Sequence, residues 1–438
     1  MSLRQNLLNG IKSLGSSDAV PLRLVFWDGE IFDFAPDPTV ALTIHSRSVL
    51  KSFLTGQIDR LGDAYVNGEI TVDGDVHDIL DVGIRLAEHF GRFSKFATLA
   101  KPLGALRFRH SKGNDATAIQ HHYDVPKEFY RPWLDRTMTY SCGYFPTGTE
   151  DIHAAQQAKI DHICRKLRLS PDDRLIDIGC GWGGLITHAA KAYGVRGVGV
   201  TNSPAQQEHS RGLIEAAGLS DRIEIRLQDY RDIPESEQFD KVVSVGMYEH
   251  VGIENLPTYF ATVARLLRPG GTLLNHGIIT TDAEGRPQGP PGGEFINRHV
   301  FPGGELSNLS RTLQEVARSG LEAVDVEDLR PHYARTLLNW VRRFEGHREE
   351  VTAAGGIERY RVWRIYLAGM AHAFDQGWLS IAQVIAYKKR DGRPAERPWS
   401  RGYQYNPDST VRLAGPLDWA KDASDAGTLP AEAGFKSY

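Results

Sequence analysis

The sequence predicts an α/β protein that is built on a doubly wound parallel sheet and preceded by a smaller α+β domain. Between residues 121 and 390, apolar strand-like runs alternate with helical stretches, a pattern typical of parallel sheets with helical crossovers. A glycine-rich turn, GCGWGG (179–184), follows the first of these runs. The length of 438 residues leaves room for roughly two or three domains.

Residues 1–90 are predicted to form an N-terminal α+β accessory domain. The runs LRLVFW (22–27) and VALTIH (40–45) are rich in β-branched and aromatic residues and predict strands. Apolar side chains at helical spacing predict a helix and turn over 48–68, and a short strand and a helix follow over 70–90. This unit carries no catalytic constellation of its own.

Residues 91–120 are predicted to form a basic amphipathic linker. Between Phe90 and Lys112 the chain has no acid and six basic residues, Arg92, Lys95, Lys101, Arg107, Arg109 and Lys112. Such a segment can lie on an anionic membrane surface. It can equally be a solvated linker helix whose apolar side packs on the neighbouring domain, and the pattern leaves both interpretations open.

The third block, 121–390, is the predicted catalytic domain. Residues 391–438 are predicted to form an extended tail, and their aromatic residues suggest that the tail packs on the rest of the protein. Five β-rich runs are followed by two helical stretches, 335–349 and 356–374, and by a last strand-like run, 378–389. The five runs are RLIDIG (174–179), GVRGVGVT (194–201), RIEIRL (222–227), DKVVSV (240–245) and GTLLNHGII (271–279).

Composition and charge exclude several classes of protein. The chain is 41% hydrophobic with a formal net charge of −4, which argues against a dedicated nucleic-acid binder. Its three Cys cannot form a disulfide framework, none has metal-ligand spacing, and a reducing, cytosolic setting fits best. No signal-peptide core is apparent, and no window approaches the roughly 18 uninterrupted apolar residues of a transmembrane helix.

Polar side chains gather where successive predicted strands end. The turn Asp177-x-Gly179-x-Gly181-x-Gly183 follows one strand, and Thr201, Asn202 and Gln206 follow the next. Gln228, Asp229 and Tyr230 follow the third, and Glu249 and His250 follow the fourth. An open α/β sheet binds its ligand at this edge. Because the spacing is tighter than the dinucleotide fingerprint, a nucleoside bearing an amino acid fits better than a dinucleotide.

These segments in register resemble the cyclopropane-fatty-acid synthase family, which includes the mycolic acid cyclopropane synthases and has the class I S-adenosylmethionine-dependent methyltransferase fold. The resemblance covers about 121–340 and rests on HHYDVPKEFY (121–130), DRTMTYSCGYF (135–145), LIDIGCGWGG (175–184), VTNSPAQ (200–206), DKVVSVGMYEHVG (240–252), NHGII (275–279), FINRHVFPGGEL (295–306) and YARTLLNW (333–340). It implies a Rossmann-like methyltransferase sheet. The N-terminal block resembles the extra domain of the phospholipid-acting bacterial members.

The resemblance implies transfer of a methylene from S-adenosylmethionine to the cis double bond of an unsaturated phospholipid acyl chain, with ring closure assisted by a bound bicarbonate. The family's cofactor contacts fall on Tyr123, Tyr140, Ser141, Gly179, Gly181, Thr201, Asn202, Gln206, Gln228, Asp229 and Tyr230. Its bicarbonate site falls on Cys142, Glu249, His276, the backbone of Ile278, and Tyr333. Asp177 is expected to support the glycine loop, and His250 to give structural support.

Each of these residues also has an ordinary structural interpretation. Cys142 could be a buried thiol, Glu249 a helix-start carboxylate, His276 a hydrogen-bonded core residue, and Tyr333 a packing residue. Five aromatic residues could flank the acyl chain or only fill the core, namely Phe145, Phe295, Phe301, Trp340 and Phe374.

Three other functions stay open: an oxidoreductase, a sibling enzyme that leaves a methylene or methyl branch, and a non-catalytic lipid-binding module. The resemblance implies a cytoplasmic protein at the inner face of the membrane. No nucleic-acid partner and no metal are expected, and a homodimer is left open.

Overall fold

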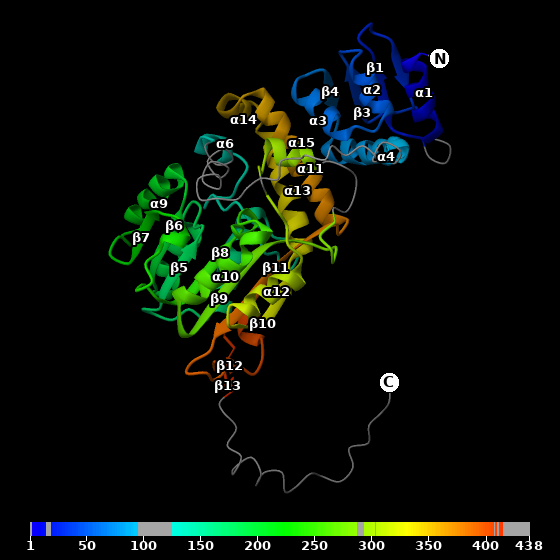
Figure 1. The fold of residues 1–438 in the computed structure, drawn as a ribbon. Coiled ribbons are helices and arrows are strands. Elements are labelled where there is room, and N and C mark those ends of the chain that lie inside the picture. The colour runs from blue at the N-terminus through cyan, green and yellow to red at the C-terminus, as the bar shows by residue number, and fades with distance from the viewer. Residues whose placement is uncertain are drawn as a thin grey trace, which may run out of the picture.

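The chain folds into an N-terminal α+β unit and a larger α/β unit (Figure 1). The computed structural model describes residues 2–14, 19–94, 125–286, 293–302, 304–406, 408–409 and 411–414. Apart from the end of one helix at 91–94, the predicted basic linker lies outside the described residues. In the part of the chain that the structure describes, no helix has the length and apolarity needed to cross a membrane.

The N-terminal unit is a four-stranded sheet in the order β2-β1-β3-β4, covered by helices. Leu22, Leu24, Val40 and Ile44 are buried between the sheet and these helices. The elements are α1 (Leu3–Leu14), β1 (Leu22–Val25), β2 (Ile31–Asp33), β3 (Val40–Ile44), α2 (Val49–Leu54), α3 (Ile58–Val66), β4 (Ile70–Asp73) and α4 (Val76–Ser94).

This unit differs from the sequence prediction in three elements. The helix and turn expected over 48–68 are two helices, α2 and α3, separated at Gly56, whose φ of 63° is left-handed. Helix α1 was not predicted, although Leu7, Leu8 and Ile11 form a buried stripe along it. Strand β2 was also missed because it is a short edge strand with no buried residue.

The larger unit contains a seven-stranded sheet in the order β10-β11-β9-β8-β5-β6-β7, which confirms the predicted doubly wound α/β class. Strands β9, β8, β5, β6 and β7 are parallel, whereas β11 runs antiparallel between β9 and β10. The strands are β5 (Arg174–Ile178), β6 (Arg196–Thr201), β7 (Ile223–Leu227), β8 (Phe239–Val245), β9 (Leu267–Thr280), β10 (Leu321–Asp328) and β11 (Leu379–Lys388). Edge strand β10 was not predicted, because its acids at 322, 325, 327 and 328 hide the apolar positions.

Helices cover both faces of this sheet. Ile176 and Ile178 of β5 pack in the same core as α10 and α12, whereas Leu175 packs with α7 and α8. The helices up to α12 are α6 (Lys127–Tyr130), α7 (Ile152–Leu167), α8 (Gly184–Tyr193), α9 (Pro204–Ala216), α10 (Leu256–Leu266), α11 (Gly293–His299) and α12 (Leu309–Arg318). The last ones are α13 (Arg330–Gly346), α14 (Arg348–Gly355) and α15 (Ile357–Asp375).

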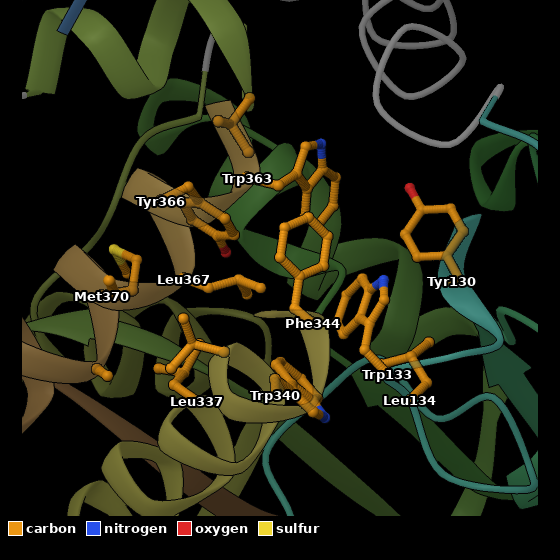
Figure 2. Packing of buried hydrophobic residues seen from close by; sticks show 14 of the residues in the cluster. Tyr130, Trp133, Leu134, Leu337, Trp340, Phe344, Trp363, Tyr366, Leu367 and Met370 are labelled. Carbon is orange, nitrogen blue, oxygen red and sulfur yellow. The ribbon is translucent and has the colours of Figure 1, made fainter. Parts of the chain in front are cut away.

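An aromatic core joins α13 and α15 to the loop after α6 (Figure 2). The ring of Trp133 lies 5.7 Å from that of Trp340 and 5.6 Å from that of Trp363, and all three side chains are buried. Aromatic pairs at such distances add to the stability gained from burial. This core fixes the loop 135–145, which carries predicted site residues.

The start of the tail contacts the catalytic domain mainly through Gln404, whereas Trp399 is 73% exposed, so packing by the tail's aromatic residues stays a prediction. This part of the tail contains β12 (Arg397–Pro398), α16 (Gly402–Tyr405) and β13 (Leu413–Ala414). Gln404 is buried, and its side-chain amide donates a 3.0 Å hydrogen bond to Asp325 of β10. Its backbone carbonyl lies 3.1 Å from His162 Nδ1 of α7.

Candidate active site

The glycine loop turns sharply at the end of β5. Gly179, Gly181 and Gly183 have φ values of 80°, 53° and 82°, a region that side chains rarely adopt. A Cβ at Gly179 would lie 2.8 Å from the side chain of Met247, whereas a Cβ at Gly181 would meet no atom within 4 Å. Gly181 therefore faces open space, and the loop can accept a ligand close to its backbone.

That space is the glycine-loop cavity, which lies at the carboxyl ends of β5, β6, β7 and β8. Ten predicted cofactor residues line it, namely Tyr140, Ser141, Gly179, Gly181, Thr201, Asn202, Gln206, Gln228, Asp229 and Tyr230. The eleventh, Tyr123, lies outside the described residues. The structure thus brings the described set together, and contact of each residue with a cofactor remains a prediction.

Hydrogen bonds among these residues fix the walls of the glycine-loop cavity. The Thr201 hydroxyl donates to Gln206 Oε1 at 2.7 Å. The Asp229 carboxylate accepts two hydrogen bonds from the Arg231 guanidinium, at 2.7 and 2.8 Å. Gln228 donates its amide to the backbone carbonyl of Asp232 at 3.0 Å. These pairs hold polar groups in place at the rim, which favours binding of a polar nucleoside.

A buried lysine beneath the cavity was missed by the sequence analysis. Lys159 of α7 is fully buried, and its ammonium donates to Ser141 Oγ at 2.9 Å. Burial lowers its pKa to about 8 and raises that of Asp177 to about 7, while their mutual attraction opposes both shifts. Lys159 follows Ala155 by four residues on the buried face of α7, and that position was the signal available in the sequence. Asp177, expected only to support the loop, also lines the cavity.

A second and larger space, the interdomain cavity, holds the predicted anion site. Its volume is about 760 Å³, and it extends from the ends of β8 and β9 to helices α3 and α4 of the N-terminal unit. All five predicted bicarbonate residues line it, namely Cys142, Glu249, His276, Ile278 and Tyr333. Chain segments more than 100 residues apart therefore meet at one place, although the role of each residue remains a prediction.

Glu249 sits in a 3-10 turn, Tyr248–His250, directly after β8. Its Oε1 accepts a 2.7 Å hydrogen bond from the backbone N–H of Ile278, and its Oε2 is buried without a partner. The Ile278 carbonyl accepts a hydrogen bond from the Tyr248 hydroxyl at 2.9 Å. Burial raises the pKa of Glu249 to about 7, and the Ile278 hydrogen bond opposes the shift. In this arrangement the Ile278 backbone positions Glu249, and its contact with an anion stays a prediction.

His276 is held by a residue that the sequence analysis missed. In the antiparallel pairing of β9 with β11, His276 lies opposite Gln383, whose amide donates to His276 Nδ1 at 3.0 Å. Burial moves the His276 pKa well below its usual range, so the ring is neutral and Nε2 carries the hydrogen. That Nε2 is buried and has no partner. A Gln in the middle of the apolar run SIAQVIAY was a signal that the sequence offered.

Cys142 and Tyr333 complete the set. Cys142 is fully buried, its Sγ lies 3.1 Å from the Gly143 carbonyl, and burial raises the pKa of its thiol. It is therefore a neutral thiol. Tyr333 packs on Phe374 with 4.6 Å between ring centroids. Of the five candidate acyl-flanking aromatic residues, only Phe295 and Phe301 line the interdomain cavity, whereas Phe145, Trp340 and Phe374 are buried in the core.

The two cavities share one wall. Tyr140, Ser141, Gly246 and His250 line both of them. His250, expected to give only structural support, therefore lies where the cavities meet, with its ring 5.5 Å from that of Phe301. A group bound in the glycine-loop cavity can reach a group bound in the interdomain cavity at this wall.

This fold and this cleft define the class of S-adenosylmethionine-dependent methyltransferases, and comparisons with known proteins give the family. The model of the mycolic acid cyclopropane synthetase family matches residues 110–384, and a domain of unknown function matches 11–95. The chain belongs to the mycolic acid cyclopropane synthetase family.

Individual relatives cover most of the chain. It is 42% identical over 386 residues to a probable fatty acid methyltransferase of Pseudomonas putida, covering 88% of this chain and 96% of the relative. It is 36% identical to the cyclopropane-fatty-acyl-phospholipid synthase of Escherichia coli, covering 74% and 82%. The crystal structure of the mycolic acid cyclopropane synthase CmaA1 complexed with SAH and CTAB matches with a TM-score of 0.60, 32% identity, and coverage of 62% and 98%.

Proposed function

We propose that this protein transfers the methyl carbon of S-adenosylmethionine to the cis double bond of an unsaturated phospholipid acyl chain and closes a cyclopropane ring. The observation that carries the proposal is the shared wall: the glycine-loop cavity suits a nucleoside, and the apolar interdomain cavity adjoins it at Tyr140 and His250. The name of the Escherichia coli relative supports the phospholipid substrate.

The glycine-loop cavity fits the cofactor by its shape and by its donors. Gly181 leaves its backbone open to a ligand, and the strand-end residues Thr201 and Gln228 offer polar groups to a nucleoside. When bound, S-adenosylmethionine supplies a methyl group on a positively charged sulfur. The protein's task is to hold that methyl about 3–3.5 Å from the alkene. Tyr140 and Ser141, which line both cavities, are placed to shape that approach.

The reaction needs an environment that stabilises a cation and accepts a proton. The alkene forms a bond to the methyl carbon while the carbon–sulfur bond breaks, which leaves a carbocation on the acyl chain. A proton must then leave the transferred methyl so that the ring can close. Aromatic faces such as those of Tyr140 and Tyr366 stabilise a cation, and the apolar lining excludes water that would trap it as an alcohol.

Glu249 and His276 fit a bicarbonate ion at this point. The neutral His276 ring offers a donor at Nε2, and Glu249 Oε2 offers an acceptor, and both atoms are buried without partners. An ion with one hydroxyl and one anionic end matches this pair of opposite hydrogen-bonding groups. When bound, bicarbonate supplies the base. The neutral thiol of Cys142 adds no competing charge.

A second candidate is the same methyl transfer followed by a different final step, which leaves a methylene or methyl branch on the acyl chain. The name of the Pseudomonas putida relative, a probable fatty acid methyltransferase, favours it. Ring closure removes a proton from the transferred methyl directly. A methylene branch first needs a hydride shift between the two chain carbons, and a methyl branch that keeps a double bond forms when a chain carbon loses the proton. The outcome therefore depends on the base beside the reacting carbons. The complete set of four anion-site side chains supports ring closure.

We also propose that the protein docks peripherally on the inner face of the membrane through its basic segment, 91–120. The support is charge alone: the stretch between Phe90 and Lys112 has six basic residues and no acid, and each basic residue contributes about 1 kcal/mol near an anionic surface. Reversing the charges of Lys101, Arg107 and Arg109 should weaken sedimentation with anionic vesicles, and salt should have the same effect. Equal binding to neutral vesicles would contradict this.

The function is tested by incubating the protein with S-adenosylmethionine and vesicles of unsaturated phospholipid. Mass spectrometry of the released acyl chains should show the gain of one CH2, and proton spectra should show cyclopropane hydrogens. Depleting bicarbonate should slow the reaction, and adding it back should restore the rate. A branch in place of the ring would favour the second candidate, and unchanged lipids in the presence of bound cofactor would reject both.

A further inference from the structure

The interdomain cavity is walled on one side by the N-terminal unit. Helices α3 and α4 of that unit face α11 and α15 of the catalytic domain across it, and these helices contact one another (Figure 1). The contacts include a 2.9 Å hydrogen bond from the Phe295 backbone N–H to Asp59, and one of 3.1 Å from the Arg361 guanidinium to the Val66 carbonyl. The wall is therefore fixed against the catalytic domain.

The side chains on this wall are aliphatic and incompletely packed. Leu61 of α3, Leu80 and Ile84 of α4, and Ile365 of α15 line the cavity and are only half-buried. Large apolar side chains normally lose more of their surface to a core, and a soluble protein rarely leaves a contiguous apolar surface uncovered. The volume of about 760 Å³ lies within the range of about 300–1,000 Å³ typical of ligand cavities.

The chemistry of the lining selects a hydrocarbon over a charged ligand. Among the described lining residues, the two arginines are already engaged, Arg364 with Glu345 at 2.7 Å and Arg286 with Asp282 at 2.9 Å. Glu249, His250 and His276 lie at the catalytic end of the cavity, and the hydroxyl of Tyr65 on α3 accepts a hydrogen bond from Arg364 at 3.1 Å. The remainder is continuous with that end and offers chiefly apolar contacts.

We propose that the N-terminal domain forms one wall of the acyl-chain site, so that α3 and α4 bind the hydrocarbon that continues beyond the reacting double bond. This inference rests on the proposed function and extends it, because it assigns a role in lipid selection to a domain whose matching family model is one of unknown function. The domain then sets which chain lengths and double-bond positions place the alkene at the wall shared by the two cavities.

Two helical glycines make the proposal testable. Gly83 of α4 and Gly369 of α15 line the interdomain cavity, and a Cβ at either position would meet no atom within 4 Å. A larger side chain at either site therefore has space beside the cavity without first displacing the protein. Gly212 of α9 is a matched control, since it is also helical and open but lines neither cavity.

The experiment compares Gly83→Phe, Gly369→Phe and Gly212→Phe on phospholipid vesicles whose acyl chains share the double-bond position but differ in length beyond it. Gly83→Phe should lower turnover of the long chain relative to the short one by at least about tenfold, the effect of losing roughly two buried methylenes. Gly369→Phe, which lies on the catalytic-domain side of the cavity, should impair turnover. Gly212→Phe should match the wild type. An unchanged long-to-short ratio in Gly83→Phe, with the variant folded by circular dichroism, would overturn the proposal.

A second measurement does not depend on turnover. A phospholipid with a photoreactive diazirine at the end of its acyl chain should label peptides of 58–66 and 76–90 in the wild-type protein. Labelling confined to 293–381 would overturn the proposal. If wild-type protein labels α3 and α4 but modifies no lipid, the chain-binding wall stands and the proposed reaction fails.

Discussion

The two cavities of this protein are built in opposite ways. The glycine-loop cavity is made of residues from the catalytic domain alone, chiefly at the ends of consecutive strands, and its walls carry polar side chains that are fixed by hydrogen bonds such as Thr201 to Gln206. The interdomain cavity is larger, chiefly apolar, and assembled from helices of both domains. One site recognises a ligand by short-range polar geometry, and the other by shape and by exclusion of water.

The difference shows what each part of the reaction requires. A nucleoside has donors and acceptors at fixed positions, so a turn with three left-handed glycines and adjacent polar side chains suffices to bind it. An acyl chain has no such groups, and only extended apolar contact can bind it. The candidate site residues Glu249 and His276 line the interdomain cavity, and Glu249 precedes His250 of the shared wall. The following predictions test each cavity separately.

The largest effect is expected from Glu249→Gln, in the interdomain cavity next to His250 of the shared wall. The substitution keeps the volume but replaces the acceptor Oε2, so turnover should fall by about 10²–10⁴-fold, the usual scale for losing a general base. Cofactor binding by calorimetry should persist, and the variant should respond to bicarbonate far less than the wild type. Glu208→Gln, at an exposed residue of α9, is the control. Normal turnover of Glu249→Gln in bicarbonate-free buffer would assign the proton acceptor to another group.

A change confined to the glycine-loop cavity should affect the cofactor and spare the lipid. Gly181→Val should lower S-adenosylmethionine affinity by at least about tenfold, since the new side chain enters the cavity, while diazirine labelling of α4 stays unchanged. Gly179→Val is a poorer test, because its Cβ would lie 2.8 Å from Met247. Gly29→Val is the matched control: its φ of 84° imposes similar backbone strain in open space, far from either cavity. Equal cofactor affinity in Gly181→Val and wild type would reject the assignment.

The pH dependence of stability should report on both sites. Glu249 and Asp177 have folded-state pKa values of about 7, above those of an unfolded chain. Their contribution to stability is therefore largest below the unfolded-state pKa values and is lost as pH rises through about 7. Each should account for on the order of 3 kcal/mol between about pH 5 and about pH 8. Urea unfolding should show this loss in the wild type and less of it in Glu249→Gln and Asp177→Asn. An identical pH profile in all three proteins would contradict the assigned pKa shifts.

The smallest effect is expected away from both cavities. Gln404→Ala removes the side-chain hydrogen bond to Asp325 but keeps the backbone carbonyl that contacts His162 and Arg165 of α7. Losing the side-chain hydrogen bond should cost about 1–3 kcal/mol of stability. Thermal unfolding measures this loss. The ratio of turnover on long and short chains should stay as in the wild type, because Gln404 lines neither cavity. A change in that ratio would mean that the tail positions the substrate site.

The sequence predicts the glycine-loop cavity far better than the interdomain cavity, and the reason is physical. Residues at the carboxyl ends of parallel strands must meet, so Thr201, Asn202 and Gln228 could be grouped from strand order alone. The seven-stranded sheet was predicted except for β10, whose acidic residues conceal its pattern. Glu249 was placed at the same sheet edge from strand order, whereas the anion-binding role of Glu249 and His276 was reached only through the family resemblance.

Other features depend on how separate surfaces pack. The spacing of Leu80 and Ile84 on α4 is the same for a helix that faces a cavity and for one that faces a core, because both environments are apolar. The sequence therefore could not distinguish them. Gln383 is a single polar residue in an apolar strand, and Lys159 falls on the buried face of α7. Such positions indicate that a buried polar partner exists but do not identify it. The N-terminal domain was therefore predicted as a fold but not as a wall of the substrate site.

The central claim is that a methyl group passes across the shared wall and closes a ring beside Glu249 and His276. Methyl-deuterated S-adenosylmethionine tests it most directly, with unsaturated phospholipid vesicles as substrate and mass and proton spectra of the product. The account predicts that the transferred carbon loses one deuterium and that the others lie in a saturated three-membered ring. Retention of all the methyl deuterium, or label in a headgroup and not in the acyl chain, would contradict it.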